Sequence, residues 1–141
     1  KDNNNTNQLC LYNMISGTEV KTSQNIPMRD TAFPVEVKKA IRSVVFIDSL
    51  NIVVSGDDNG DVILWNYETL EIINHIKLNE QNINRGGYVQ VASVVFYMSS
   101  NQLNVFAGCW VTTQNDRHTG ALFRIIIPKN DCKFIFCLNK K

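Results

Sequence analysis

The sequence lacks an excess of charge of either sign. Its 14 lysines and arginines are matched by 13 aspartates and glutamates, which leaves a net charge of +1. Nucleic acid and anionic lipid attract proteins through an excess of positive charge. The chain also has no apolar run close to the roughly 20 residues that a membrane-spanning helix needs. We therefore expect neither nucleic acid nor a membrane as a partner.

The N-terminus lacks the apolar stretch of a secretory signal, since the chain opens with the polar residues KDNNN. We therefore expect a soluble, intracellular protein. The cytoplasm is the default location, with the nucleus or a ciliary or cytoskeletal site as alternatives.

Paired cysteines are missing as well. The four cysteines include no CxxC pair, and they are too few and too scattered for a disulfide framework. We expect free thiols. A zinc site is the functional alternative, but the spacing of its candidate ligands fits no finger or knuckle pattern. Those candidates are Cys109, His118, Cys132 and Cys137.

Motifs of catalysis and cofactor binding are also absent. The chain has two histidines, His75 and His118, and neither belongs to a nucleophile motif. Cys109 and His118 could form a pair, but no third residue is placed to orient them. No glycine-rich loop ends in Lys-Ser or Lys-Thr, as a phosphate-binding loop would. We expect a protein that is not an enzyme and holds no cofactor.

One acidic stretch has the residue spacing of a calcium-binding loop. Asp57, Asn59, Asp61 and Glu68 occupy the first, third, fifth and twelfth places of an EF-hand loop. The sixth place requires glycine but holds Val62, and the following residues alternate as a strand does. We expect no calcium site here.

An internal repeat is present. The letters SVVF at residues 43–46 recur at 93–96, 50 residues further along the chain. Downstream, Gly56 is echoed by Gly108, and residues 60–65 return more loosely at 120–125. A period near 50 residues indicates a repeat architecture.

Each repeat consists of short apolar or alternating runs separated by Asn, Asp and Gly. This pattern predicts strands and tight turns. In the central unit we expect strands at about 41–48, 51–56, 61–67 and 71–78. In the third unit we expect them at about 89–98, 103–109, 120–127 and 133–138. The first unit keeps two strands, near 8–13 and 18–22.

Residues 53–66, VVSGDDNGDVILWN, resemble the core of a WD repeat. In that family a Ser-Gly pair ends the second strand, an acidic tight turn follows, and the third strand ends in Trp-Asp. The chain departs from the pattern at Asn66 and Asn59, where Asp is expected, and at residues 37–39, where Gly-His is missing. The family's buried Asp-His-Ser-Trp network is therefore expected to be absent or degraded.

The resemblance implies an all-β fold, a partial β-propeller of four-stranded antiparallel blades. Residues 1–36 would hold the last two strands of one blade and an Asn-rich linker, 37–79 a complete blade, and 80–141 a third blade with a long loop at 109–119. Propellers close with four to eight blades, so this arc cannot close alone. We favour a segment of a longer chain over an incomplete ring finished by a second copy or another partner.

The resemblance further implies a protein–protein interaction scaffold, a propeller segment within a larger assembly that docks a protein or peptide. Aromatic and arginine side chains carry large contact area and bidentate hydrogen bonding at interface centres. The candidate docking residues lie in the long connections and are Arg85, Trp110, Arg117 and His118. Two alternatives stay open: Trp110 packs as core, or the blades are purely structural and the functional surface lies elsewhere.

Overall fold

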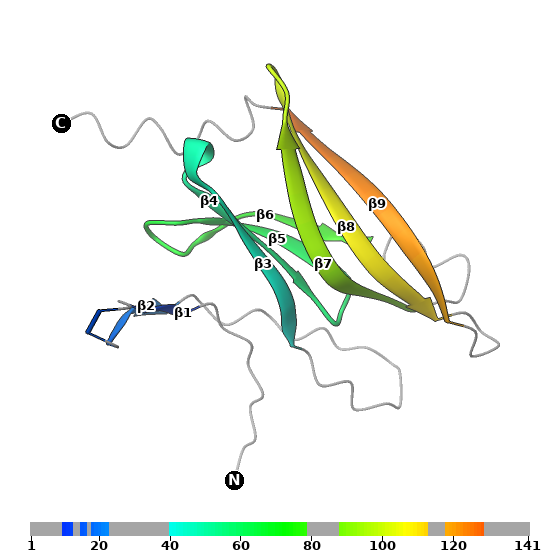
Figure 1. The fold of residues 1–141 in the computed structure, drawn as a ribbon, viewed down its shortest axis with the longest axis horizontal. Coiled ribbons are helices and arrows are strands. Elements are labelled where there is room, and N and C mark those ends of the chain that lie inside the picture. Colours follow the sequence, from blue (N-terminus) through cyan, green and yellow to red (C-terminus); the bar gives the residue numbers. More distant parts are fainter. Residues whose placement is uncertain are drawn as a thin grey trace, which may run out of the picture.

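The structure, a computed structural model, describes residues 10–12, 15–16, 18–22, 40–78, 88–112 and 118–128. In these residues the chain is all-β, as the sequence predicts, and forms antiparallel sheets of two, four and three strands (Figure 1). The two-stranded sheet is a hairpin of β1 (Cys10–Tyr12) and β2 (Glu19–Thr22).

The central sheet has the order β3-β4-β5-β6. Its strands are β3 (Ile41–Ile47), β4 (Ile52–Asp57), β5 (Asp61–Asn66) and β6 (Ile72–Lys77). A single 3-10 turn, η1 (Asp48–Leu50), links the first two. All four strands lie within a residue or two of their predicted positions, because each is a short apolar run ended by turn residues.

The third sheet has the order β7-β8-β9, with β7 (Tyr88–Met98), β8 (Gln102–Thr112) and β9 (His118–Pro128). The fourth strand predicted at 133–138 lies outside the described residues. The long loop predicted at 109–119 is wrong in its extent, because Cys109–Thr112 still belong to β8 and pair with residues 118–121 of β9. Most of the extra residues between Gly108 and Gly120 lengthen the two strands, whose backbone groups satisfy one another along the hairpin.

The sequence repeat is also a repeat of register. Ser43 pairs with Gly56 in the central sheet, and Ser93 pairs with Gly108 in the third. Each first strand is irregular directly before its serine, with one residue, Arg42 or Ala92, left out of the pairing. Such a bulge bends a strand and increases its twist. The two sheets are therefore equivalent in strand register and bulge position, and not only in sequence.

Each of the two sheets has two faces that can be matched through the pairing. We call the face that contains Gly56, or Gly108, the glycine face, and the opposite one the valine face. On the central sheet the glycine face includes Val45, Val54 and Leu64, and the valine face includes Val44, Val53 and Trp65. On the third sheet the glycine face includes Val95, Phe106 and Arg124, and the valine face includes Val94, Val105 and Ile125.

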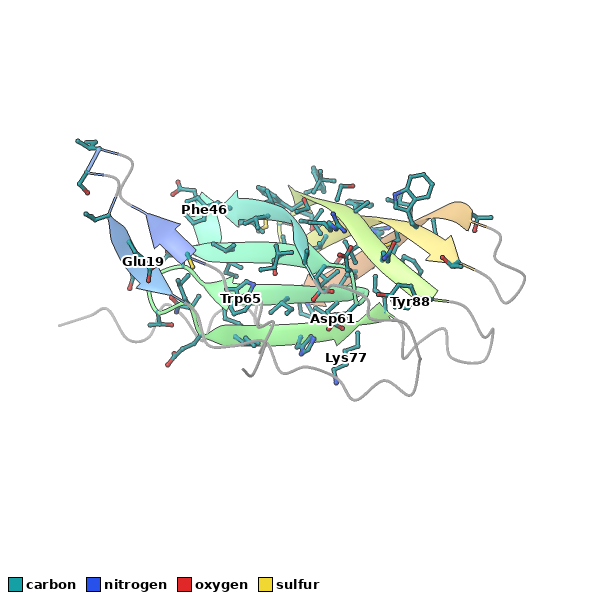
Figure 2. The ribbon with its side chains drawn as sticks, turned by 90° about the horizontal axis from the view of Figure 1, so that it is seen from below. Glu19, Phe46, Asp61, Trp65, Lys77 and Tyr88 are labelled. Atoms are coloured by element: carbon teal, nitrogen blue, oxygen red, sulfur yellow. The ribbon has the colours of Figure 1, made fainter. Side chains whose placement is uncertain are left out.

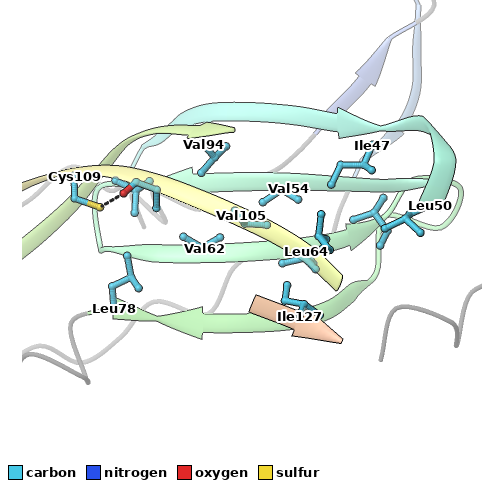
Figure 3. Packing of buried hydrophobic residues seen from close by; sticks show 14 of the residues in the cluster. Ile47, Leu50, Val54, Val62, Leu64, Leu78, Val94, Val105, Cys109 and Ile127 are labelled. Carbon is cyan, nitrogen blue, oxygen red and sulfur yellow. Dashed lines mark hydrogen bonds between the residues drawn. The ribbon is translucent and has the colours of Figure 1, made fainter. Parts of the chain in front are cut away.

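The main core lies between the glycine face of the central sheet and the valine face of the third (Figure 3). Val54 and Leu64 from one side meet Val94 and Val105 from the other, and all four are almost fully buried. Burial of apolar surface of this kind is the main favourable contribution to folding. The two equivalent sheets are thus stacked head to tail, one kind of face against the other kind.

The strand β7 makes the closest approach to the central sheet, where it contacts β3, β4 and β5 (Figure 1). No closed ring of sheets is formed by the described part of the chain. None of the helices within the described ranges is long and apolar enough to cross a membrane.

Candidate functional site

One turn and three strand ends meet at one end of the two stacked sheets. The Tyr88 hydroxyl donates a hydrogen bond to the carbonyl oxygen of Asp58, in the turn between β4 and β5. Tyr88 pairs with Thr112, which in turn pairs with His118 across the β8–β9 hairpin. Figure 2 shows Asp61 and Tyr88 at this same end. The β4–β5 turn, the start of β7, the end of β8 and the start of β9 therefore lie together.

The β4–β5 turn is built around Asp57. One of its carboxylate oxygens, Oδ1, accepts hydrogen bonds from the amides of Asn59 and Asp61, both at 2.9 Å. Gly60 has φ 75°, a conformation that glycine adopts without steric cost. The other oxygen, Oδ2, is buried without a hydrogen-bond partner among the described residues. The acidic turn is therefore held by its own side chain.

Burial raises the pKa of Asp57 to about 6, and the charge of Asp61 acts in the same direction. Hydrogen bonds from the amides of Asp61 and Asn59, and the nearby His75, oppose this rise. His75 Nε2 lies 3.3 Å from Asp61 Oδ2 without hydrogen-bond geometry. This cluster of two carboxyls and one imidazole lies on the valine face of the central sheet, away from the third sheet.

Asp58 joins the turn to the start of β3. Its Oδ1 accepts a hydrogen bond at 2.6 Å from Arg42 Nε, and its Oδ2 accepts one at 3.3 Å from the amide of Ala40. Its own amide donates to the carbonyl oxygen of Ala40 at 3.1 Å. The hydrogen bond and the charge of Asp58 raise the pKa of Arg42, which thus stays a cation. Desolvation raises the pKa of Tyr88 to about 12, so its hydroxyl stays a donor.

A groove of about 310 Å³ opens beside this ion pair. Its lining residues come from both sheets and are Arg42, Asp58, Gln90, Val91, Ala92 and Trp110. A second hollow, of about 240 Å³, lies on the other side of Trp110 and is lined by Ala92, Gly108, Cys109, Gly120 and Ala121 besides the tryptophan. Trp110, 56% exposed, stands between the two depressions.

Of the four docking residues predicted from the sequence, Trp110 is the one whose side chain the structure describes. It lies in β8, paired with Gln90 and Gly120, and is exposed, which is contrary to the alternative that it packs as core. His118 begins β9, but its side chain is outside the description. Arg85 and Arg117 lie outside the described residues.

The structure adds Arg42, Asp58, Tyr88 and Gln90 to this end of the molecule. The repeat could have drawn attention to Arg42, since this residue is equivalent to Ala92 in the third sheet. Its role depends on the bulge that turns it toward Asp58, and pairing irregularities cannot be derived from alternation alone.

The hydrogen-bond network expected to be absent or degraded is retained in one part. Trp65 Nε1 donates to Ser55 Oγ at 2.8 Å, and both side chains are buried. Asn66, which stands where the WD pattern has Asp, accepts hydrogen bonds from the amides of Glu68 and Thr69 and so closes the next turn. Asparagine can replace aspartate here because the turn needs an acceptor and not a charge.

Cys109 is buried, and desolvation raises the pKa of its thiol to about 11. Its Sγ contacts the Ala107 carbonyl oxygen at 3.5 Å (Figure 3). A thiol in this state is a weak nucleophile at neutral pH. Two of the other residues of the zinc alternative, Cys132 and Cys137, lie outside the described residues, within which no three His, Cys, Asp or Glu side chains cluster as metal ligands would.

The calcium-like spacing is separated by the fold. Asp57 and Asp61 flank the β4–β5 turn, whereas Glu68 follows β5 at the opposite end of the sheet, where its side chain is exposed. These residues cannot surround one ion.

The groove at the other end of the sheet combines an aromatic ring, Trp110, with the Arg42–Asp58 ion pair and the neutral polar side chain of Gln90. Such a composition suits binding of a polypeptide.

Comparison with known proteins gives no independent assignment. No protein-family model matches the sequence, and no curated protein matches it. The resemblance to WD repeats consequently rests on the residues quoted for it.

Proposed function

We propose that this chain is a non-catalytic protein–protein interaction scaffold, a segment of a WD-type β-propeller that docks a protein or peptide partner. The observation that carries the proposal is the groove beside Trp110, which residues of both sheets line near the β4–β5 turn and the start of β7. A large exposed aromatic beside an arginine is the usual composition of an interface centre.

The head-to-tail stack supports the propeller part of the proposal. Adjacent blades of a propeller are successive repeats packed face to face, and the two sheets here have the same register, the same bulge and the same Ser-Gly pair. The buried Ser55–Trp65 hydrogen bond adds a feature of the WD pattern.

The partner is expected to place an acidic or hydrogen-bond-accepting group near Arg42 and an apolar side chain against Trp110. The ion pair between Arg42 and Asp58 offers a cation at the groove, because Arg42 is more than half exposed while Asp58 is buried. The one carboxylate among the groove residues, Asp58, is held by Arg42 and the Ala40 amide, and no hydroxyl or thiol side chain stands beside it, so this surface favours binding over turnover.

The proposal is tested by affinity capture from native cells with the tagged chain, with Trp110→Ala and with Gly108→Ala. We expect the captured set to be lost with Trp110→Ala and kept with Gly108→Ala, because Gly108 lies outside the groove. Capture that is indifferent to Trp110→Ala would contradict docking at this groove.

The alternative is that the sheets are purely structural and complete a propeller whose functional surface lies elsewhere. This alternative is favoured by the position of Trp110, which lies in strand β8, on the glycine face of the third sheet, and not in a loop. In that case Trp110→Ala changes stability or assembly but no binding partner.

A further inference from the structure

The two ends of the stack are open in complementary ways. Within the part of the chain that the structure describes, nothing covers the glycine face of the third sheet, where Val95, Tyr97 and Leu122 are exposed by 58%, 63% and 71%. At the other end, on the valine face of the central sheet, Val44 of β3 is 50% exposed. Exposed apolar patches of this kind mark interaction surfaces. The interface inside the chain shows how such faces fit together.

Inside the chain, β7 fits over Gly56. A Cβ atom at Gly56 would lie 2.3 Å from Val91 Cγ1 and 3.1 Å from Val94 Cγ1, so the two valines occupy the space that a side chain would need. The amide of Val94 donates to Ser43 Oγ at 3.1 Å, beside the glycine. The Ser-Gly pair of the central sheet is therefore a socket, and the bulged strand β7 with its two valines is the plug.

The third sheet repeats the socket, and no described residue of another sheet fills it. Ser93 and Gly108 form the equivalent pair, and among the described residues a Cβ at Gly108 would meet Ser93 Oγ at 2.7 Å and no side chain of another sheet. The hollow of about 240 Å³ lies over this position, with Trp110 as one wall. In the central sheet the equivalent space, over Gly56, is filled by strand β7.

The central sheet repeats the plug, and there Val44 is exposed while Ile41 packs against the cluster of Val53 and Trp65. In β3 the same bulge separates Ile41 from Ser43, so that Ile41 and Val44 take the places of Val91 and Val94. Val94 is 4% exposed in its socket, whereas Val44 is 50% exposed. Over β4 and β5 the same face is already buried, at Val53 and Trp65 among others, so β3 is the open part.

We propose that copies of this chain bind one another head to tail, with β3 of one copy entering the hollow over Gly108 of the next. Two hollows placed face to face would not fill each other, so a symmetric contact between two third sheets fits the shapes less well. A head-to-tail contact uses two different surfaces, and it therefore continues to further copies until a ring closes or a fibre grows.

The first measurement is the mass of the wild-type chain in solution by light scattering and sedimentation across a wide concentration range. We expect the mass to rise beyond that of a dimer. Gly108→Ala fills the socket and Val44→Lys places a charge on the plug, so each is expected to abolish the rise. Ile15→Lys, on an exposed apolar residue of the first hairpin, is the matched control and is expected to leave association unchanged.

An equimolar mixture of the Gly108→Ala and Val44→Lys chains supplies the sharpest test. Each chain keeps one intact surface, so the mixture is expected to associate again and to stop at a dimer of unlike chains. A wild-type chain that keeps the mass of one copy at every concentration would overturn the proposal. Wild-type association that survives Gly108→Ala would do so as well.

The folding of each variant is checked by amide hydrogen exchange. If Val44→Lys does not fold, the Gly108→Ala chain alone decides, because its added methyl displaces only the end of the Ser93 side chain. The inference does not rest on the function proposed above. Trp110 lines both the groove and the hollow, but Gly108 lines only the hollow, so Gly108→Ala is expected to abolish self-association and to keep partner capture.

Discussion

Trp65 is fully buried, yet its indole N–H keeps a partner in Ser55. A buried donor without an acceptor costs more than the hydrogen bond contributes when it is made, because the group has lost its water. Ser55 is equally buried and has Ile63 as its cross-strand neighbour, so water cannot reach the indole N–H to take the place of the serine hydroxyl. At the equivalent positions of the third sheet stand Ala107 and Ile125, which need no such bond.

Ser55→Ala is expected to lower the free energy of unfolding by about 1–3 kcal/mol, since it leaves Trp65 Nε1 without an acceptor. Urea unfolding followed by tryptophan fluorescence measures this. Ser100→Ala, at an exposed serine in the β7–β8 turn, is the control and should change the value by less than about 0.5 kcal/mol. Equal effects of the two substitutions would contradict the role given to Ser55.

Asp57 makes stability depend on pH. Its pKa in the fold, about 6, is above the ordinary value of 3.8, so folding favours the protonated form. The stabilisation that protonation contributes is present below pH 3.8 and is lost as the pH rises through about 6.

Asp57→Asn keeps an oxygen that can accept the amides of Asn59 and Asp61 but cannot ionise. We expect the variant to gain stability relative to wild type, by on the order of 1–3 kcal/mol, as the pH rises through this window. Thermal melts at several pH values measure the difference, with Asp48→Asn, at an exposed aspartate of η1, as control. A difference that stays constant with pH would count against an ionisable Asp57.

Among the elements, the first strand of each sheet is the one that repeats most closely. Both β3 and β7 have the bulge, the SVVF letters and the pairing of serine with glycine. The two glycines nevertheless face different surroundings, because Gly56 lies under β7, whereas no sheet among the described strands lies over Gly108. The same residue in the same register therefore has a different tolerance for a side chain.

Gly56→Ala is expected to destabilise the chain by about 1–3 kcal/mol, because its methyl would overlap Val91 and push β7 away. Gly108→Ala is expected to cost much less, since only the Ser93 hydroxyl must move. Chemical denaturation of the two variants at a concentration too low for association measures both. A larger loss in Gly108→Ala than in Gly56→Ala would refute the stacking geometry.

At the scale of the molecule, the central and third sheets share one core and should unfold together. The core cluster contains residues of both sheets, with Val91 of β7 fully buried in it. The stack is therefore a single cooperative unit across the sheet interface.

Val91→Ala is expected to lower the free energy of unfolding by about 1–3 kcal/mol and to reduce amide protection in β4 and β8 alike. Hydrogen exchange resolved by strand is the measurement. Val95→Ala, four residues further along β7 but on the exposed face, is the control. Loss of protection in β8 while β4 keeps its own would show that the two sheets open separately.

The strands, the tight turns and the repeat were determined by the sequence alone, because they depend on neighbours along the chain. Alternation, the Asp-Asp-Asn-Gly turn at 57–60 and the recurrence of SVVF predicted all four strands of the central sheet and the described strands of the third. From the sequence, the β8–β9 hairpin is predicted too short, because residues 109–112 and 118–119 are assigned to a loop, whereas each of them has a strand partner opposite.

Tertiary structure alone decided which face of each sheet is covered. Val94 and Val95 are adjacent, identical residues, yet one is 4% exposed and the other 58%. Nothing in the local sequence separates them, since either face of an alternating strand could be the buried one. The bulge sets which valine points toward the central sheet, and the shape of that sheet around Gly56 receives it. The groove of Arg42, Asp58 and Trp110 follows from the same packing, because its residues meet only when the two sheets are stacked.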